Sequence, residues 1–194
     1  MVRVIAGRFR SRRLRTLEGN ATRPISDRLK EALFSLLQDR LAGSCFLDCF
    51  AGSGSIGIEA ISRGAGLTVF VESSVGAAGV IRGNLEVLGL SAASTQRLMV
   101  VPAESALRIL HQAARKFDIV FLDPPYAASA QYQTVLELLQ DYGLLDPGAI
   151  VAAKHSKRFD LEPRVRGLVR YRRIQQGDSV LSMFRQEGEA TAKP

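Results

Sequence analysis

A carboxylate, two prolines and a tyrosine stand together past the middle of the chain, as Asp123, Pro124, Pro125 and Tyr126. The preceding run over 117–122 is almost wholly apolar and short, which is typical of a strand covered on both faces. The prolines end that strand, because neither can donate a hydrogen bond to a sheet and each fixes its own φ. Asp123 is therefore predicted at the carboxyl end of a strand, the edge where open α/β sheets bind ligands.

This corner suits the chemistry of an exocyclic amino group on a nucleobase, which is a poor nucleophile because its lone pair is delocalised into the ring. The Asp123 carboxylate and the Pro124 carbonyl could accept hydrogen bonds from its two N–H groups and favour a pyramidal nitrogen. A hydrogen bond to a carboxylate is roughly twice as strong as a neutral one. Tyr126 could stack on the base, for about 1–3 kcal/mol. The competing interpretation is a strand that ends in a Pro-Pro turn with a surface tyrosine, and these four residues alone do not decide.

A second set of candidate residues lies around a glycine turn earlier in the chain. Gly52, Gly54 and Gly57 spell G-x-G-x-x-G, Asp48 precedes them at a predicted strand end, and Glu72 follows. This spacing is also the dinucleotide-binding fingerprint. However, the charge of Asp48 would oppose a pyrophosphate, and a chain of 194 residues leaves no substrate domain for a dehydrogenase. S-adenosylmethionine fits better, because it has no phosphate, an α-amino group for Asp48 and ribose hydroxyls for Glu72.

The segments that carry these residues alternate between strand-like and helix-like patterns. Strands are predicted over 45–50, 67–71, 98–101, 117–122 and 149–153, and a helix follows each of the first four. Two alternating runs over 168–176 and 179–185, joined by Gly177-Asp178, predict an antiparallel hairpin. The expected fold class is α/β: a mostly parallel, seven-stranded sheet with helices on both faces and a C-terminal antiparallel hairpin. The turn at 146–148 would lead into the fifth strand.

The N-terminal end is basic and has its own pattern. Residues 2–14 resemble a short β-hairpin whose outward side chains are arginines, and Ser26 is a plausible N-cap for a helix over 27–41. Net charges are +7 over residues 1–30, −5 over 31–150 and +5 over 151–194. Basic clusters are the footprint of polyanion binding. The candidate RNA-binding residues are Arg3, Arg8, Arg10, Arg12, Arg13, Arg15 and Arg23.

Two ordinary explanations of these charges stay open. The basic ends could be solvated surface only. Alternatively, Asp27 and Glu31 could pair with Arg23, Arg28 and Lys30, so that the charges brace the first helix.

The composition favours a cytosolic protein. The chain is 46% hydrophobic, which is enough for a sizeable core, and it has two cysteines, Cys45 and Cys49, inside one apolar run. They are predicted to be reduced core residues. No run of 18 apolar residues exists, and the first 15 residues are too rich in arginine for a signal peptide. No association with a membrane is therefore expected. His111 and His155 are isolated in the sequence, so no metal site is predicted.

Together, the segment over 48–54 and the D-P-P-Y corner resemble the Rossmann-like S-adenosylmethionine methyltransferases that act on exocyclic nitrogen. That corner is shared with adenine and cytosine amino-methyltransferases. The opening of the chain narrows the resemblance to the bacterial small-subunit ribosomal RNA guanine-N2 methyltransferases of the RsmD type. The matching residues are Arg3 to Gly7, Arg12 to Leu14, Arg23-Pro24, Asp27-Arg28, Ala32 to Phe34 and Gly177-Asp178.

The resemblance implies a set of site residues and a partner. The cofactor would be held by Asp48, Phe50, Ala51, Gly52, Ser53, Gly54, Glu72, Ser73, Ala103, Glu104 and Asp123. Where the family usually has Asp or Asn before Ala to reach the adenine, this chain has Ala103, so the contact would come from Glu104 or from backbone. A glutamate that the family often has near Ala152 or Ala153 is also absent. The implied partner is 16S ribosomal RNA, within the small subunit or an assembly intermediate, and a monomer is expected.

We expect three regions: a basic N-terminal hairpin extension (1–24), a methyltransferase domain (25–187) and a disordered tail (188–194). Two other functions compete with RNA methylation. A DNA adenine-N6 methyltransferase would normally need a target-recognition domain, which this length disfavours. A non-catalytic RNA-binding factor in ribosome assembly is the other, and the intact set of Asp48, Glu72 and residues 123–126 argues against it.

Overall fold

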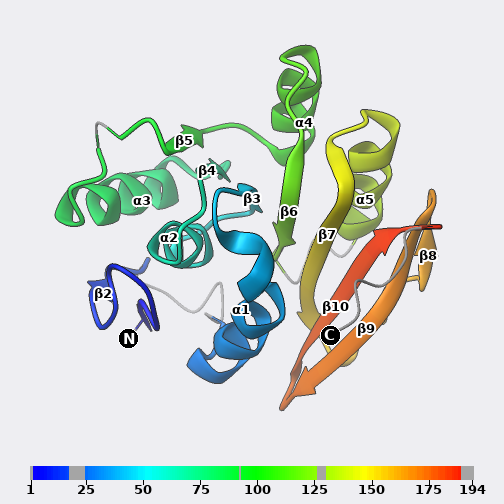
Figure 1. Cartoon of the computed structure of the whole chain (residues 1–194), viewed down its shortest axis with the longest axis horizontal. Coiled ribbons are helices and arrows are strands. Elements are labelled where there is room, and N and C mark those ends of the chain that lie inside the picture. The colour runs from blue at the N-terminus through cyan, green and yellow to red at the C-terminus, as the bar shows by residue number, and fades with distance from the viewer. Residues whose placement is uncertain (1, 18–24, 92, 126–129, 189–194) are drawn as a thin grey trace.

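The computed structural model describes residues 2–17, 25–91, 93–125 and 130–188, and its centre is one twisted sheet with helices on both faces (Figure 1). Within these residues the strand order is β5-β4-β3-β6-β7-β10-β9-β8. The first five of these strands are parallel to one another, and the last three are joined antiparallel. The predicted fold class is therefore confirmed, with a short eighth strand, β8, in addition to the seven expected.

The elements of the main sheet and its helices have the following bounds. The strands are β3 (Cys45–Cys49), β4 (Leu67–Val71), β5 (Gln96–Met99), β6 (Phe117–Leu122), β7 (Leu145–Ser156), β8 (Arg164–Val165), β9 (Leu168–Gln176) and β10 (Ser179–Gln186). The helices are α1 (Asp27–Leu41), α2 (Ser55–Ser62), α3 (Val75–Val87), α4 (Ala103–Gln112) and α5 (Ala130–Asp141).

Two layers of apolar side chains hold the helices to the sheet. One face packs against α4 and α5 around Val120, Leu136 and Val151. The other packs against α1 and α2 around Phe46 and Phe121. Because side chains alternate across a strand, each apolar strand contributes to both layers. This is why the central strands read as continuous apolar runs in the sequence.

Helix α1 has the bounds that the sequence predicted. Its N-cap is Ser26, whose Oγ accepts a hydrogen bond from the backbone N–H of Leu29, and Asp27 in the first turn complements the helix dipole. Leu29, Leu33 and Leu37 are buried as expected. The helix thus closes one face of the sheet and presents its N-terminal end beside the tip of the β9–β10 hairpin, where Ser26 Oγ donates to Gln176 Oε1 at 2.9 Å.

Strand β7 is longer than predicted, at both ends. The segment over 146–148 was predicted as a turn, but the strand already begins at Leu145 and carries an irregularity in its pairing with β6 between Phe117 and Ile119. Such an irregularity accommodates Pro147 within a strand, because the proline needs no ladder partner there. The strand also continues past Ala153 to Ser156, since β10 pairs with it over that stretch.

The N-terminal segment over 2–17 is called the arm from here on, and it forms a small two-stranded sheet of β1 (Val2–Arg3) and β2 (Arg13–Leu14) (Figure 1). It packs on α2 and α3 through Val4 and Phe9. Gly7 takes φ +82°, and a Cβ there would lie 1.9 Å from the carbonyl oxygen of Ser62. The arm is thus seated closely on α2.

Residues 18–24 and 189–194 lie outside the described part of the chain. The predicted boundary of the extension near residue 24 and the predicted disordered tail therefore stay predictions. Among the described residues, no helix is long and apolar enough to cross a membrane.

Candidate active site

Parallel strands bring the candidate chemical groups to one edge of the sheet. Asp48 stands near the carboxyl end of β3, Glu72 directly after β4 and Asp123 directly after β6. In register, Cys49 of β3 pairs with Leu122 of β6. The structure therefore brings together the two sets of residues that the sequence predicted separately, the glycine turn and the D-P-P corner.

The glycine turn between β3 and α2 is held in one shape. Phe50, Gly52 and Gly54 all have left-handed backbone, with φ of 65°, 57° and 76°. Glu72 fixes this turn to the end of β4, because its Oε2 accepts from the N–H of Gly52 and its Oε1 from that of Ser74, each at 2.8 Å. The predicted contact residues Ala51, Ser53 and Ser73 lie in the same two loops, and the carbonyl of Ser53 accepts from Asn84 Nδ2 at 2.9 Å.

Asp48 is a buried carboxylate beneath this turn. Its side chain accepts a hydrogen bond from the N–H of Gly57 at 2.9 Å, at the first turn of α2. Burial raises the pKa of Asp48 to about 8, and the negative charges of Asp123 and Glu72 contribute to the rise, while the Gly57 N–H opposes it. An ionised Asp48 therefore calls for a cation at this edge.

This set of donors and acceptors fits S-adenosylmethionine. Carboxylates surround the turn, so the site favours an ammonium and a sulfonium over a pyrophosphate, and Glu72 retains lone pairs for ribose hydroxyls. Ala103, the first residue of α4, is buried, and Glu104 beside it is partly exposed at the same edge of the sheet. Either Glu104 or the nearby backbone is therefore available to an adenine ring.

The D-P-P corner contains an ion pair that the sequence did not predict. Lys154 Nζ, from β7, lies 2.8 Å from both carboxylate oxygens of Asp123. The lysine side chain is only 4% exposed, whereas that of Asp123 is 27% exposed. Burial raises the pKa of Asp123, and the charge and hydrogen bonds of Lys154 act against that rise. Pro124 is buried and Pro125 exposed, and Tyr126 lies outside the described residues.

The arm places most of the predicted RNA-binding arginines in solvent. Arg10, Arg12, Arg13 and Arg15 are exposed, and Arg8 is exposed while its guanidinium stacks over the Phe9 ring at 5.0 Å. Arg3 has a different contact, since its Nε lies 3.0 Å from Asp27 Oδ2 on α1. Arg23 lies outside the described residues. Hence one of the predicted RNA-binding arginines pairs with the first helix, although the sequence analysis had named Arg23, Arg28 and Lys30 as the partners of Asp27.

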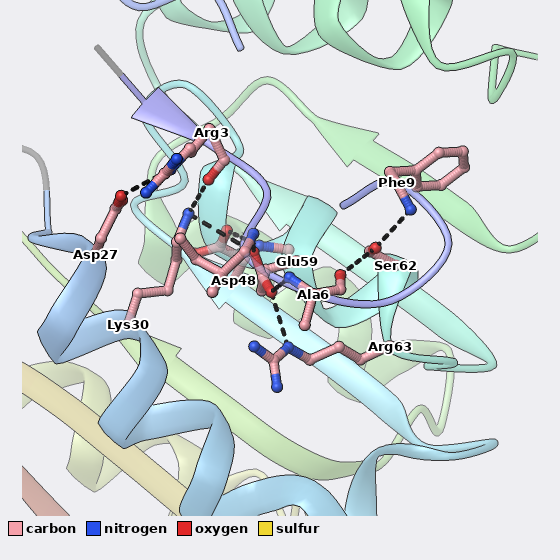
Figure 2. A network of polar contacts seen from close by, with 11 residues as sticks. Arg3, Ala6, Phe9, Asp27, Lys30, Asp48, Glu59, Ser62 and Arg63 are labelled. Carbon is pink, nitrogen blue, oxygen red and sulfur yellow. Dashed lines mark hydrogen bonds and ion pairs between the residues drawn. The ribbon is translucent and has the colours of Figure 1, made fainter. Parts of the chain in front are cut away.

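The sequence analysis offered Lys30 as a partner for Asp27 or Glu31, but the contacts of its ammonium lie with Glu59 and the arm. Lys30 is fully buried, and its Nζ donates to the carbonyl of Arg3 at 2.6 Å and lies 3.7 Å from Glu59 Oε2 (Figure 2). Glu59, on α2, also accepts from the N–H groups of Ile5 and Ala6 at 2.7 and 2.9 Å. This buried cluster joins α1, α2 and the arm.

A groove of about 440 Å³ opens beside the hairpin tip. It lies on the α1 face at the same edge as the corner, because Ser179 of β10 pairs with Ser156 at the end of β7. Its lining comes from α1 and from the hairpin: Arg28, Leu29, Ala32, Ile174, Gln175, Gln176 and Gly177.

Neither histidine stands in a possible metal cluster. His111 Nδ1 lies 2.8 Å from the carbonyl of Tyr142, and His155 Nε2 lies 2.9 Å from Ser182 Oγ. Across the described ranges, no group of three or more His, Cys, Asp or Glu could hold a metal ion.

Comparison with known proteins identifies the family. Residues 2–185 match the family described as "Conserved hypothetical protein 95". The chain belongs to this family. Two curated relatives are "Ribosomal RNA small subunit methyltransferase D" of Haemophilus influenzae (36% identical, covering 90% of this chain and 93% of the relative) and "Putative rRNA methyltransferase YlbH" of Bacillus subtilis (33%, covering 96% and 100%). The solved structure "Putative methyltransferase yhhF from Escherichia coli" superposes with a TM-score of 0.81, at 28% identity over 96% of this chain and 98% of that one.

Membership in this family confirms the resemblance to RsmD-type methyltransferases that the corner and the chain's opening indicated. It also confirms the Rossmann-like fold, and S-adenosylmethionine is the cofactor of such methyltransferases. The roles of individual residues stay predictions, since none of these comparisons tests them.

Proposed function

We propose that this protein transfers a methyl group from S-adenosylmethionine to the exocyclic N2 of a guanine in 16S ribosomal RNA, at a site of the guanine-966 type, and so produces N2-methylguanine. The observation that carries the proposal is the position of Asp123. Its partly exposed carboxylate stands at the sheet edge next to the carboxylate-lined glycine turn. An amino-group acceptor and a site for a cationic methyl donor thus adjoin one another.

The residues of the glycine turn would hold the cofactor. Asp48 would take its ammonium group, Glu72 its ribose hydroxyls, and the backbone over 50–54 with Ser73 would surround it. The adenine would lie against Ala103 and Glu104 at the start of α4. The bound cofactor supplies an electrophilic methyl group, and the protein must present a nitrogen lone pair to it.

The corner would present that nitrogen. Asp123 and the Pro124 carbonyl accept hydrogen bonds from the two N–H groups of the guanine amino group, and this draws its lone pair out of conjugation. Pro125 stiffens the loop, and Tyr126 stacks on the flipped base. Catalysis is then mostly positioning, because the reacting atoms are held in line before reaction. The N–C bond would form as the bond between sulfur and the methyl group breaks, S-adenosylhomocysteine would leave, and the amino nitrogen would release one proton to solvent.

The arm would contact the phosphates of the RNA. Its exposed arginines form a basic surface, while the buried Lys30–Glu59 cluster holds the arm in one place relative to the cofactor turn. Phosphate contacts supply affinity and orientation without reading sequence. We propose that the protein acts as a monomer in the cytoplasm, on the small subunit or an assembly intermediate.

The product of the reaction tests this proposal. Purified protein is incubated with labelled S-adenosylmethionine and small ribosomal subunits from cells that lack the modification, and the RNA is digested to nucleosides for mass spectrometry. The proposal predicts N2-methylguanosine in 16S RNA. N6-methyladenine in DNA supplied in a parallel incubation would favour the adenine methyltransferase instead. Stable subunit binding without any transferred label would favour a non-catalytic assembly factor.

A further inference from the structure

We propose that Lys154 is a positioning residue for methyl transfer, which keeps Asp123 ionised and correctly oriented as the acceptor for the amino group. The proposal rests on the proposed function, because it assigns Lys154 a role through Asp123. Lys154 itself need not touch the substrate.

The contact between the two side chains is symmetrical and sheltered. Lys154 Nζ lies 2.8 Å from Oδ1 and 2.8 Å from Oδ2 of Asp123. A carboxylate has about four lone-pair positions on its two oxygens, so two hydrogen bonds from the lysine leave others for a substrate N–H. Because the lysine holds both oxygens at once, the plane of the carboxylate is fixed before the base arrives.

The sheet register sets this arrangement. Leu122 of β6 pairs with Ala153 of the parallel strand β7. The residue after each of them, Asp123 and Lys154, therefore lies beside the other. Ile150 and Ala152 belong to the core beneath α1, and Lys154 follows them on the same face of β7. The lysine therefore reaches the corner from a rigid central strand.

Electrostatics explains why a cation is needed there. Burial raises the pKa of Asp123, and the charge and hydrogen bonds of Lys154 from β7 oppose that rise, while the charge of Asp123 in turn helps to raise the pKa of Asp48 on β3. Burial and a like charge both disfavour the carboxylate form, and an opposite charge favours it. A protonated Asp123 would offer a donor where the reaction needs an acceptor. Without Lys154, a larger fraction of Asp123 would be protonated at neutral pH.

A purely structural role for Lys154 makes different predictions. Its backbone carbonyl accepts a hydrogen bond from the Tyr132 hydroxyl, and its stem lies in the core. Loss of such a residue would lower the melting temperature but would not move the pH dependence of catalysis. The two roles are thus separable by kinetics.

The first test compares Lys154→Met and Lys154→Arg with the parent. We measure kcat and KM for RNA from about pH 5 to about pH 9. For Lys154→Met we expect the acid limb of kcat to move up by about 1–3 pH units and kcat at neutral pH to fall about 10- to 1,000-fold. Lys154→Arg retains a permanent charge and should keep the limb near the parent position. The matched control is Lys157→Met, which breaks the exposed 2.7 Å pair with Asp178 and should change neither quantity.

The second test is a double-mutant cycle. If Lys154 acts only through the carboxylate, adding Lys154→Met to Asp123→Asn should lower kcat less than twofold further. This double variant leaves no unpaired buried charge, so it is expected to fold even if Lys154→Met alone does not. The proposal would be overturned if the losses of kcat in the two single variants multiply in the double variant. It would also be overturned if the acid limb of kcat in Lys154→Met lies at the same pH as in the parent. Full turnover by Asp123→Asn would instead overturn the role of Asp123 in the proposed function.

Discussion

The buried cluster beneath the arm gives a prediction whose size can be worked from the structure. Glu59 has no exposed surface, and its carboxylate serves four partners: the N–H groups of Ile5 and Ala6, Arg63 Nε at 2.8 Å and Lys30 Nζ at 3.7 Å (Figure 2). Glu59→Gln keeps the shape of the side chain but removes its charge. The ammonium of Lys30 is then left buried without its counter-charge.

Removing one partner of a buried ion pair costs about 3–5 kcal/mol, because the other charge stays desolvated. In a domain of this size, 1 kcal/mol corresponds to about 2–4 °C in melting temperature. We therefore expect Glu59→Gln to melt about 6–20 °C below the parent. The arm should also become a faster substrate for trypsin, since its backbone would lose an acceptor on α2.

The pH dependence of this loss has a defined sign. Burial lowers the pKa of Lys30, and the charge of Glu59 opposes that shift. In Glu59→Gln the pKa of Lys30 falls further, so at alkaline pH the unfolded chain binds a proton that the folded protein does not. Stability rises with pH in that range, and the deficit relative to the parent should narrow.

The matched control is Glu187→Gln, the same chemical change in an exposed pair. Glu187 and its partner Arg164 have side chains 53% and 60% exposed, so this variant should lose less than about 1 kcal/mol. Thermal melts by circular dichroism at several pH values measure both variants. Equal melting temperatures for Glu59→Gln and Glu187→Gln would refute the view that the cluster anchors the arm.

Three further predictions concern the cofactor and the RNA. Asp48→Ala or Glu72→Ala should weaken S-adenosylmethionine by about 1.5–3 kcal/mol in calorimetry, through a lost charged hydrogen bond, and tight binding of a nicotinamide dinucleotide by the parent would refute the assignment. Because the pKa of Asp48 is raised to about 8, cofactor affinity should increase about tenfold per pH unit up to that value, and Asp48→Asn should flatten the dependence. Replacing Arg10, Arg12 and Arg13 with alanine should weaken RNA binding and lower its salt slope by up to about 0.9 per contact, with cofactor affinity unchanged; an unaltered slope would mean that they only solvate the arm.

Much of the fold was predictable because its signals are local. The buried strands β4 and β6 and the helix α1 were predicted with the bounds they have, since apolar runs, prolines and the Ser26 cap all act within a few residues. The position of the glycine turn and the D-P-P corner at one edge of the sheet was also predictable. Their meeting follows from the rule that parallel strands end at one edge.

The residues that the sequence did not reveal depend on distant partners. Strand β7 was predicted to end at Ala153, where the apolar run stops before Lys154 and His155. In the structure the Lys154 side chain pairs with Asp123, and the His155 ring lies against Ser182 Oγ. Pairing with β10 continues the strand to Ser156. The only local signal was a lone lysine directly after an apolar run.

The buried cluster was missed for the same reason. Nothing in the sequence near Glu59 marks it as buried, and Lys30 was considered only as a partner for Asp27 or Glu31 on its own helix. Only the packing of α1, α2 and the arm brings them together. Their burial could not be inferred from spacing, because the partners lie on different elements.

The central claim is that Asp123 is the acceptor for the amino group in methyl transfer. The most direct measurement is turnover on small ribosomal subunits by the parent, Asp123→Asn and Asp123→Ala, with cofactor affinity measured by calorimetry on the same samples. We predict partial activity for Asp123→Asn, since its amide oxygen still accepts a hydrogen bond. For Asp123→Ala we predict turnover lost to background with little change in cofactor affinity. Near-normal turnover by Asp123→Ala would contradict the account.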